Sequence, residues 1–170
     1  MRMRRARLPD AAAIYRLIAL YAEQGLLLAR TEDEIRRNIS HFLVHTQKGQ
    51  LAGCLSLEPY TADLAEIRSV AVDPAMRGRG IGPRLVEFAL TEARQDGIAR
   101  VFAVTHATEF FERLGFAAAS REALTEKIER DCRTCAKRRS CKLVAVIATV
   151  LPERVVLPIL GESATPVSAA

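Results

Sequence analysis

The sequence is poor in aromatic residues, in cysteine and in long hydrophobic runs. Only 5% of its 170 residues are aromatic, which argues against a surface that stacks nucleic-acid bases. Four cysteines in a chain of this length do not suggest a disulfide-stabilised scaffold. The longest apolar run near the C-terminus, residues 143–151, is shorter than the ~20 residues that a membrane-spanning helix needs. The basic N-terminus is not followed by an apolar signal segment, so the sequence predicts a cytoplasmic protein.

The composition is typical of one globular domain. Hydrophobic residues make up 49% of the chain and charged residues 26%, a balance found in folded proteins. We expect residues 1–151 to form this domain and residues 152–170, which end in small residues, to form a flexible extension. The net charge of +5 favours an anionic partner, and nucleic acid, a phosphorylated cofactor and a carboxylate substrate all meet that condition.

Hydrophobic spacing predicts an α/β (α+β) fold with a mixed, mainly antiparallel sheet flanked by helices. Thr31 and Glu34 form a capping box at the start of one helix, and the region 43–72 alternates as an antiparallel meander. Asp10 is the expected N-cap of the first helix, and Pro83 suits the first position of a later one. The predicted strands are 4–8, 42–45, 51–57, 64–72, 100–105, 116–120 and 143–151, and the predicted helices are 10–24, a second from Thr31, 83–96 and 108–114.

A glycine-rich segment, Arg77-Gly78-Arg79-Gly80-Ile81-Gly82, joins the strand 64–72 to the helix 83–96. Glycines let successive backbone N–H groups converge on an anion, and the helix N-terminus adds a partial positive charge. A plain surface turn is the alternative. The preceding meander argues against a dinucleotide-binding fingerprint, and the lack of Gly-Lys-Ser/Thr argues against a P-loop. We therefore predict a phosphate-binding site here.

Two motifs resemble landmarks of the GCN5-related N-acetyltransferase (GNAT) superfamily. Val70-Ala71-Val72-Asp73-Pro74 followed by the glycine-rich segment resembles its acetyl-CoA motif, and Phe111-Glu112-Arg113-Leu114-Gly115-Phe116 resembles its second landmark. The resemblance covers about residues 2–150 and implies acetyl-CoA as co-substrate, without a metal, between strands 64–72 and 100–105 that splay apart. The residues implied to bind it are Val70, Ala71, Val72, Arg77, Gly78, Arg79, Gly80, Ile81, Gly82, Pro83 and Phe111.

A narrower resemblance is to amino-acid N-acetyltransferases of the N-acetylglutamate synthase type. It rests on residues 26–30, 63–69 and 109–116, and on Lys127-Ile128 leading to Asp131-Cys132-x-x-Cys135. It implies L-glutamate as the acceptor, in the step that commits glutamate to arginine synthesis. Another amino acid or a small amine is the alternative acceptor. The chain departs from the pattern at Lys142-Leu143, where an acidic pair usually follows the last cysteine.

Glu66 is the candidate general base. An amine attacks a thioester only when neutral, yet at pH 7 an amino group is mostly protonated, and a nearby carboxylate can take that proton. A structural ion pair with Arg68 or another basic residue is the alternative. Arg68 leaves the same face of the strand and, with Arg30, could bind a substrate carboxylate; surface ion pairs are the alternative for both. The resemblance implies that Leu28 lines the same pocket.

Phe111 stands where many superfamily members have a tyrosine that protonates the leaving coenzyme A thiolate. A phenyl ring cannot donate a proton, although a thiol of pKa ~8.5 is a tolerable leaving group. Tyr60, Thr105 and His106 are candidate substitutes. The phenylalanine also keeps open a non-catalytic acetyl-CoA-binding sensor or partner subunit, and a homodimer is compatible with the sequence.

Three cysteines, Cys132, Cys135 and Cys141, lie in a basic segment. A structural zinc site takes four ligands, and no histidine lies nearby, so we predict reduced cysteines and no metal. Because no aromatic residues interleave with the basic residues of this segment, a solvated surface is the expectation rather than a nucleic-acid site.

Overall fold

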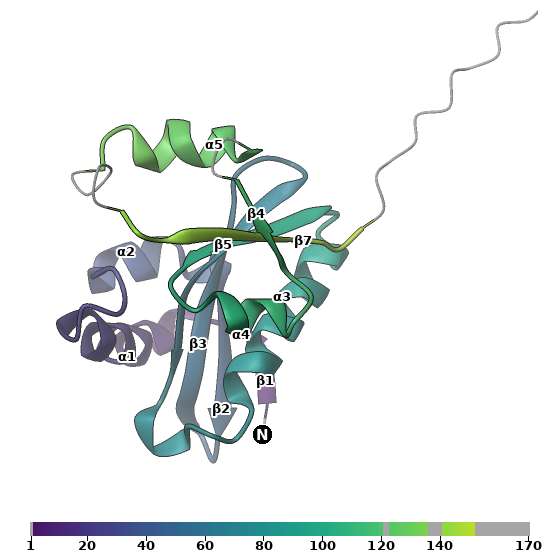
Figure 1. Ribbon diagram of the computed structural model, residues 1–170. Coiled ribbons are helices and arrows are strands. Elements are labelled where there is room, and N and C mark those ends of the chain that lie inside the picture. The colour runs from purple at the N-terminus through teal and green to yellow at the C-terminus, as the bar shows by residue number, and fades with distance from the viewer. Residues whose placement is uncertain (1, 121–122, 136–140, 152–170) are drawn as a thin grey trace, which may run out of the picture.

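The computed structural model describes residues 2–120, 123–135 and 141–151. One sheet of seven strands, in the order β1-β2-β3-β4-β5-β7-β6, forms its centre (Figure 1). The strands are β1 (Arg2–Arg5), β2 (Phe42–Gln47), β3 (Gln50–Pro59), β4 (Leu64–Val72), β5 (Arg100–Thr105), β6 (Ala117–Ala119) and β7 (Val144–Thr149). The helices are α1 (Ala11–Glu23), α2 (Glu32–Arg37), α3 (Ile81–Gln95), α4 (Thr108–Glu112) and α5 (Thr125–Lys127), which continues into a π-helical turn (Ile128–Cys132).

The predicted meander is confirmed. Strands β1 to β4 pair antiparallel with their neighbours, and the β2–β3 turn places Lys48 and Gly49 at φ +49° and +79°, as a tight hairpin turn requires. Among the described strands, only β4 and β5 pair in parallel, and the connection between them contains the helix α3. The sheet is therefore mixed and mainly antiparallel, as the sequence predicts.

Helices cover both faces of the sheet (Figure 1). The buried stripe of α1, which is Ala11, Ile14, Leu17, Ile18 and Tyr21, packs with Ile35 of α2 on Phe42 and Val44 of β2. On the other face, α3 packs on β3 and β4 together with Phe111 of α4. A third cluster, Leu64, Phe102, Leu124 and Ala145, lies where the chain leading into α5 covers β4, β5 and β7.

Several predicted element boundaries shift. The Thr31–Glu34 capping box is present, and α2 ends at Arg37. A strand begins at Phe42 as predicted, but it extends to Gln47, two residues beyond the predicted end. Helix α3 begins at Ile81, so Pro83 is its third residue, where a missing N–H still costs nothing. Asp10 occupies the predicted N-cap position of α1, but its carboxylate accepts hydrogen bonds from the Arg7 N–H and the Arg4 guanidinium instead of from the helix.

Strands β4 and β5 separate where the predicted cofactor site lies. Their pairing is restricted to Leu64–Glu66 against Arg100–Phe102. Beyond Arg68, β4 also contains one extra residue relative to β3, and Ser69 adopts a φ of +52°. This bulge lets Glu66, Arg68 and Ala71 share the face that carries α1 and α2.

No helix in the described part of the chain is long and apolar enough to cross a membrane. The predicted boundary at residue 151 stays a prediction, because residues 152–170 lie outside the described residues, as do residues 137–139 of the basic segment.

Phe102 anchors the strand pair at the point of separation. It is fully buried, and its ring meets the edge of Tyr60 at a centroid distance of 5.3 Å. We expect Phe102→Ala to lower the free energy of unfolding by about 3–5 kcal/mol, because the cavity cannot fully close. Chemical denaturation measures this loss. Tyr15→Ala on the exposed face of α1 is the control, and an equal loss in both variants would contradict the assignment of Phe102 to the core.

Candidate active site

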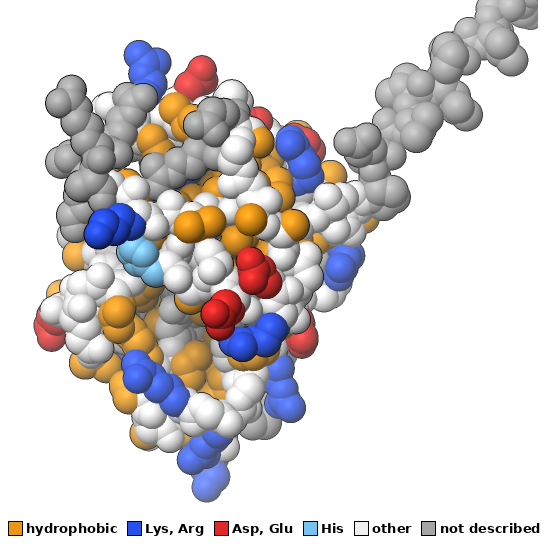
Figure 2. Space-filling view, in the orientation of Figure 1, with side chains coloured by type: hydrophobic (Ala, Val, Ile, Leu, Met, Phe, Trp, Pro, Cys, Tyr) orange, Lys and Arg blue, Asp and Glu red, His pale blue; other side chains and the backbone are white. Residues whose placement is uncertain are grey.

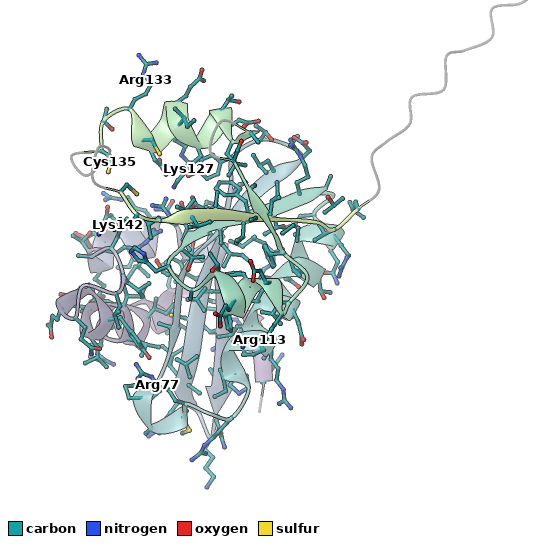
Figure 3. All side chains as sticks on the ribbon, in the orientation of Figure 1. Arg77, Arg113, Lys127, Arg133, Cys135 and Lys142 are labelled. Atoms are coloured by element: carbon teal, nitrogen blue, oxygen red, sulfur yellow. The ribbon has the colours of Figure 1, made fainter. Side chains whose placement is uncertain are left out.

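The glycine-rich segment forms the turn that starts α3. Gly78 and Gly80 have φ angles of +74° and +71°, and no atom lies within 4 Å of a Cβ added at either position. The turn therefore requires glycine for its backbone conformation, not for lack of space. The first N–H groups of the 15-residue helix α3 have no intrahelical partner, which suits them to bind an anion. Figure 3 places Arg77 in the lower part of the view, and Figure 2, in the same orientation, shows several Lys and Arg side chains in that region.

Arg77 ties this turn to α1. Its Nε donates a hydrogen bond to the Tyr21 hydroxyl at 3.1 Å, and its guanidinium lies 5.1 Å from the centre of the Tyr21 ring. The same hydroxyl donates to the carbonyl oxygen of Val72 at the end of β4. Tyr21 therefore fixes the strand and the turn relative to each other.

Two neighbouring phenylalanines occupy different positions. Phe111 is 4% exposed and packs between Phe110 and Phe116, each at 5.1 Å between ring centroids. Phe110 is partly exposed, and its ring lies 3.6 Å from a Cβ added at Gly82. Phe110 is therefore the aromatic side chain beside the glycine-rich turn, and it was missed from the sequence; a cofactor contact by Phe111 stays a prediction.

Glu66 is buried at the separation of β4 and β5, with 2% of its surface exposed. Its Oε2 accepts hydrogen bonds from the Tyr60 hydroxyl at 2.7 Å and from Lys127 Nζ at 2.9 Å. Arg68 is more distant, with its Nε 3.7 Å from the same oxygen. The nearest cation to Glu66 is therefore Lys127, the last residue of α5 (Figure 3).

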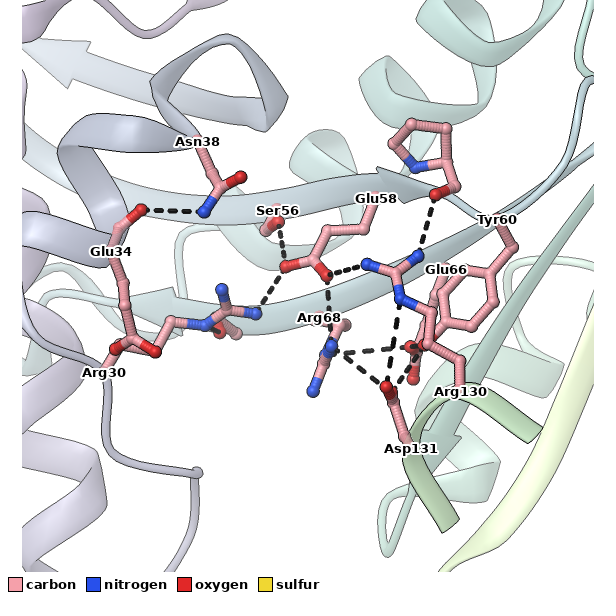
Figure 4. Close-up of polar contacts among 12 residues, drawn as sticks. Arg30, Glu34, Asn38, Ser56, Glu58, Tyr60, Glu66, Arg68, Arg130 and Asp131 are labelled. Atoms are coloured by element: carbon pink, nitrogen blue, oxygen red, sulfur yellow. Dashed lines mark hydrogen bonds and ion pairs between the residues drawn. The ribbon is translucent and has the colours of Figure 1, made fainter. Parts of the chain in front are cut away.

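Arg30 and Arg68 both form ion pairs with one carboxylate, that of Glu58, which the sequence did not single out. Arg30 Nη2 lies 2.6 Å from Glu58 Oε1, and Arg68 Nη1 lies 3.0 Å from Glu58 Oε2 (Figure 4). Ser56 donates a third hydrogen bond at 3.1 Å. Burial acts to raise the pKa of Glu58, yet the charges of Arg68 and Arg30 outweigh it and hold this pKa below its ordinary value. A signal existed, since Ser56 and Glu58 are polar residues in an otherwise apolar strand.

The turn after α5 adds a third carboxylate. Asp131 Oδ2 lies 2.6 Å from both Lys127 Nζ and the Tyr60 hydroxyl, and 3.5 Å from Arg68 Nη1. The Arg130 guanidinium lies 4.3 Å from the centre of the Tyr60 ring. Burial, followed by the charge of Glu66, raises the pKa of Tyr60 well above its ordinary value, so this side chain keeps its proton at neutral pH. We refer to Arg30, Glu58, Tyr60, Glu66, Arg68, Lys127, Arg130 and Asp131 as the polar cluster.

Other predicted positions lie outside the polar cluster. Leu28 is 66% exposed, although Arg30, two residues later, enters the cluster. Cys132, Cys135 and Cys141 form no disulfide among the described residues. Among the residues that the structure describes, no group of three or more His, Cys, Asp or Glu side chains could hold a metal ion.

Comparison with known proteins places this geometry in a family. The model of the acetyltransferase (GNAT) family matches residues 8–116. An uncharacterised N-acetyltransferase of Chlorobaculum tepidum is 41% identical over 148 residues, which cover 87% of this chain and 96% of the relative. An amino-acid acetyltransferase of Mycobacterium tuberculosis is 42% identical over 117 residues, which cover 67% of each chain.

A solved structure adds a second line of support. The N-acetylglutamate synthase of Neisseria gonorrhoeae, complexed with coenzyme A and N-acetyl-glutamate, matches with a TM-score of 0.80 and 32% identity over 88% of this chain. The match spans only 35% of that longer chain. The family model, the relatives and the splayed sheet agree with the fold predicted from the two sequence motifs. This chain belongs to the acetyltransferase (GNAT) family of acyltransferases.

Proposed function

We propose that this protein transfers the acetyl group of acetyl-CoA to the α-amine of an amino acid, with L-glutamate as the acceptor. The observation that carries the proposal is the placement of one buried carboxylate, Glu66, 3.7 Å from Arg68 at the point where β4 and β5 separate, with Arg30 on the neighbouring carboxylate of Glu58. The Neisseria gonorrhoeae synthase, complexed with coenzyme A and N-acetyl-glutamate, supports the choice of acceptor. The reaction would supply the first intermediate of arginine synthesis.

The chain offers acetyl-CoA two backbone surfaces. The pyrophosphate binds the N–H groups of residues 78–82, where the glycine-rich turn meets α3, and Pro83, which has no N–H, follows them in the helix. The pantetheine pairs with Val70–Val72, since β4 has no pairing with β5 beyond Glu66. A backbone N–H of β4 polarises the thioester carbonyl, as an oxyanion-type contact does. Phe110, which lies beside Gly82, covers the turn from the side of α4.

Glu66 prepares the acceptor for attack. It removes a proton from the ammonium group, directly or through a water, and the neutral amine attacks the thioester carbon. The C–N bond forms as the C–S bond breaks, coenzyme A leaves as a thiolate, and the nitrogen loses its second proton to solvent to give the amide. Phe111 has no proton to give, which is tolerable because a thiolate is a stable leaving group.

Arg30 and Arg68 bind the acceptor's carboxylates. Their side chains are 13% and 23% exposed, so both are partly accessible while paired with Glu58. A guanidinium carries five N–H donors in a planar fork, enough to hold Glu58 and a substrate carboxylate together. The charge of +5 on the whole chain favours the approach of an anionic amino acid.

A panel of amino acids tests the acceptor. Thiol release from acetyl-CoA, followed with a chromogenic disulfide, is expected to be fastest with L-glutamate. Faster release with another amino acid or a small amine would show that this compound, and not L-glutamate, is the preferred acceptor, with acetyl transfer still the reaction. Binding of acetyl-CoA with no release for any amine would indicate the sensor or partner subunit that Phe111 leaves open.

Glu66→Gln tests the base. We expect kcat/KM to fall by about 10²–10⁴-fold, the usual contribution of a general base, with the largest deficit at mildly acidic pH. The dissociation constant of acetyl-CoA should not change, because Glu66 is outside the glycine-rich turn. Glu87→Gln, on the exposed side of α3, is the matched control. A variant with the wild-type pH profile would remove Glu66 from the mechanism.

Arg30→Gln tests the carboxylate site. We expect KM for L-glutamate to rise about tenfold or more, since truncating one partner of a buried charge pair typically costs ~2–5 kcal/mol. The affinity for acetyl-CoA should stay the same. Arg36→Gln removes an exposed arginine of α2 that pairs with Glu32 at 3.4 Å and should leave KM unchanged. Equal KM values in the wild type and Arg30→Gln would contradict the assignment.

A further inference from the structure

Three side chains from outside the glycine-rich turn surround the carboxylate of Glu66. Lys127 and Asp131 lie one helical turn apart, at the end of α5 and in the π-helical turn, and Tyr60 lies in the β3–β4 connection. The Tyr60 hydroxyl contacts Glu66 Oε2 at 2.7 Å and Asp131 Oδ2 at 2.6 Å. Lys127 Nζ contacts the same two oxygens at 2.9 and 2.6 Å. One phenol and one ammonium therefore bridge two carboxylates.

From this geometry we propose that Tyr60, Lys127 and Asp131 are positioning residues for Glu66, which hold its carboxylate in place and set the pH at which it accepts a proton. The proposal rests on the proposed function, in which Glu66 is the general base. It assigns a role to α5 and the following turn, which the cofactor and acceptor sites do not use.

Lys127 and Tyr60 differ in the number of hydrogen bonds that they can donate to the two carboxylates. Lys127 has three N–H donors, and they point to Glu66, to Asp131 and, at 3.2 Å, to the Tyr60 oxygen. Tyr60 has a single proton and can donate it to only one carboxylate at a time. Removing the Tyr60 hydroxyl therefore removes a hydrogen bond that stabilises the charged form of Glu66. Neutralising Asp131 instead removes a negative charge that destabilises this charged form. These two changes act on Glu66 with opposite signs.

The Tyr60 ring is held independently of its hydroxyl. One edge contacts Phe102 at 5.3 Å between centroids, and the Arg130 guanidinium lies 4.3 Å from its centre. Arg130 also donates to the Pro59 carbonyl at 3.0 Å. Replacing tyrosine by phenylalanine therefore removes the hydroxyl and leaves the packing of the ring unchanged.

Other charged groups around Glu66 stay constant in the test. Glu58 on β3 lies opposite Glu66 in the strand register, and Arg68 on β4 lies 3.7 Å away. Arg30 and Arg130 reach Glu58 from the loop before α2 and from the π-helical turn. Glu66 and Asp131 differ in solvent exposure, since their side chains are 3% and 27% exposed. Although burial acts to raise the pKa of Asp131, hydrogen bonds from Lys127 and Tyr60 hold it below its ordinary value, so Asp131 is charged at neutral pH.

The test compares the acid limb of the kcat/KM profile in two variants. We expect Tyr60→Phe to move its midpoint up by about 0.5–1 pH unit, and Asp131→Asn to move it down by a similar amount. Lys127→Met, which removes the nearest cation, should move it up further than Tyr60→Phe. Asp63→Asn, an exposed acid-to-amide change in the same β3–β4 connection, and Tyr15→Phe on α1 are the controls and should leave the midpoint unchanged.

The same shifts are measurable without turnover. Carboxyl carbon-13 NMR titration reports the protonation of Glu66, with its signal assigned by its loss in Glu66→Gln, and thermal melts show that each variant is folded. If Lys127→Met fails to fold, Tyr60→Phe and Asp131→Asn still give the two opposite signs. Shifts of the same sign, or lower rates with unmoved midpoints, would overturn the proposal. An absence of acetyl transfer in the wild type would defeat the proposed function, while the NMR shifts would still decide whether the three residues control Glu66.

Discussion

Two buried carboxylates oppose each other across neighbouring strands, and the rest of the site compensates for them. Glu58 of β3 and Glu66 of β4 are paired in the strand register and are 6% and 2% exposed. Like charges directly opposite on a sheet repel, and the repulsion grows when water is excluded. Cations must therefore reach both. Arg30 and Arg68 meet Glu58 at 2.6 and 3.0 Å, and Lys127 meets Glu66 at 2.9 Å.

The separation of β4 and β5 connects this polar cluster to the glycine-rich turn. Parallel pairing stops at Glu66, so the strand leaves its neighbour immediately after the carboxylate. The bulge at Ser69 then returns Ala71 to the face of Arg68, and Tyr21 fixes the end of β4 to Arg77. A group bound along β4 between the turn and Glu66 would present its reactive end to the polar cluster. The order of residues in one strand thus sets the distance between the glycine-rich turn and the polar cluster.

Local signals were sufficient for much of this arrangement. The span 64–72, the capping box at Thr31 and the glycine-rich turn all depend on neighbours within a few residues, and each was predicted from the sequence. Glu66 and Arg68 share a face because side chains alternate along a strand, which the sequence also shows. The Ser69 bulge was not predicted, since a positive φ at a non-glycine residue leaves no mark in hydrophobic periodicity. Phe110 and Phe111 are adjacent, and only the packing of α4 decides which one is buried.

Long-range partners could not be predicted in the same way. Tyr60 and Lys127 are separated by 67 residues and Tyr21 and Arg77 by 56, so their contacts depend on the closed fold. Glu58 was visible as a polar residue in an apolar strand, but its two arginines come from a loop and from the next strand. The predicted ion-pair alternative for Glu66 is present in the structure, although its nearest cation is Lys127 rather than Arg68.

Stability alone does not account for so many buried charges. Taking an ion pair out of water costs about as much as the attraction returns, and well-packed apolar residues often serve the fold equally well. A hydrophobic replacement would also avoid the repulsion between Glu58 and Glu66. What apolar residues cannot provide is a carboxylate of fixed orientation beside partly exposed guanidinium groups. The polar cluster lies where the parallel pairing of β4 and β5 stops, at Glu66. The free energy that burying these charges costs is therefore spent at the position where a polar acceptor would have to be held beside β4.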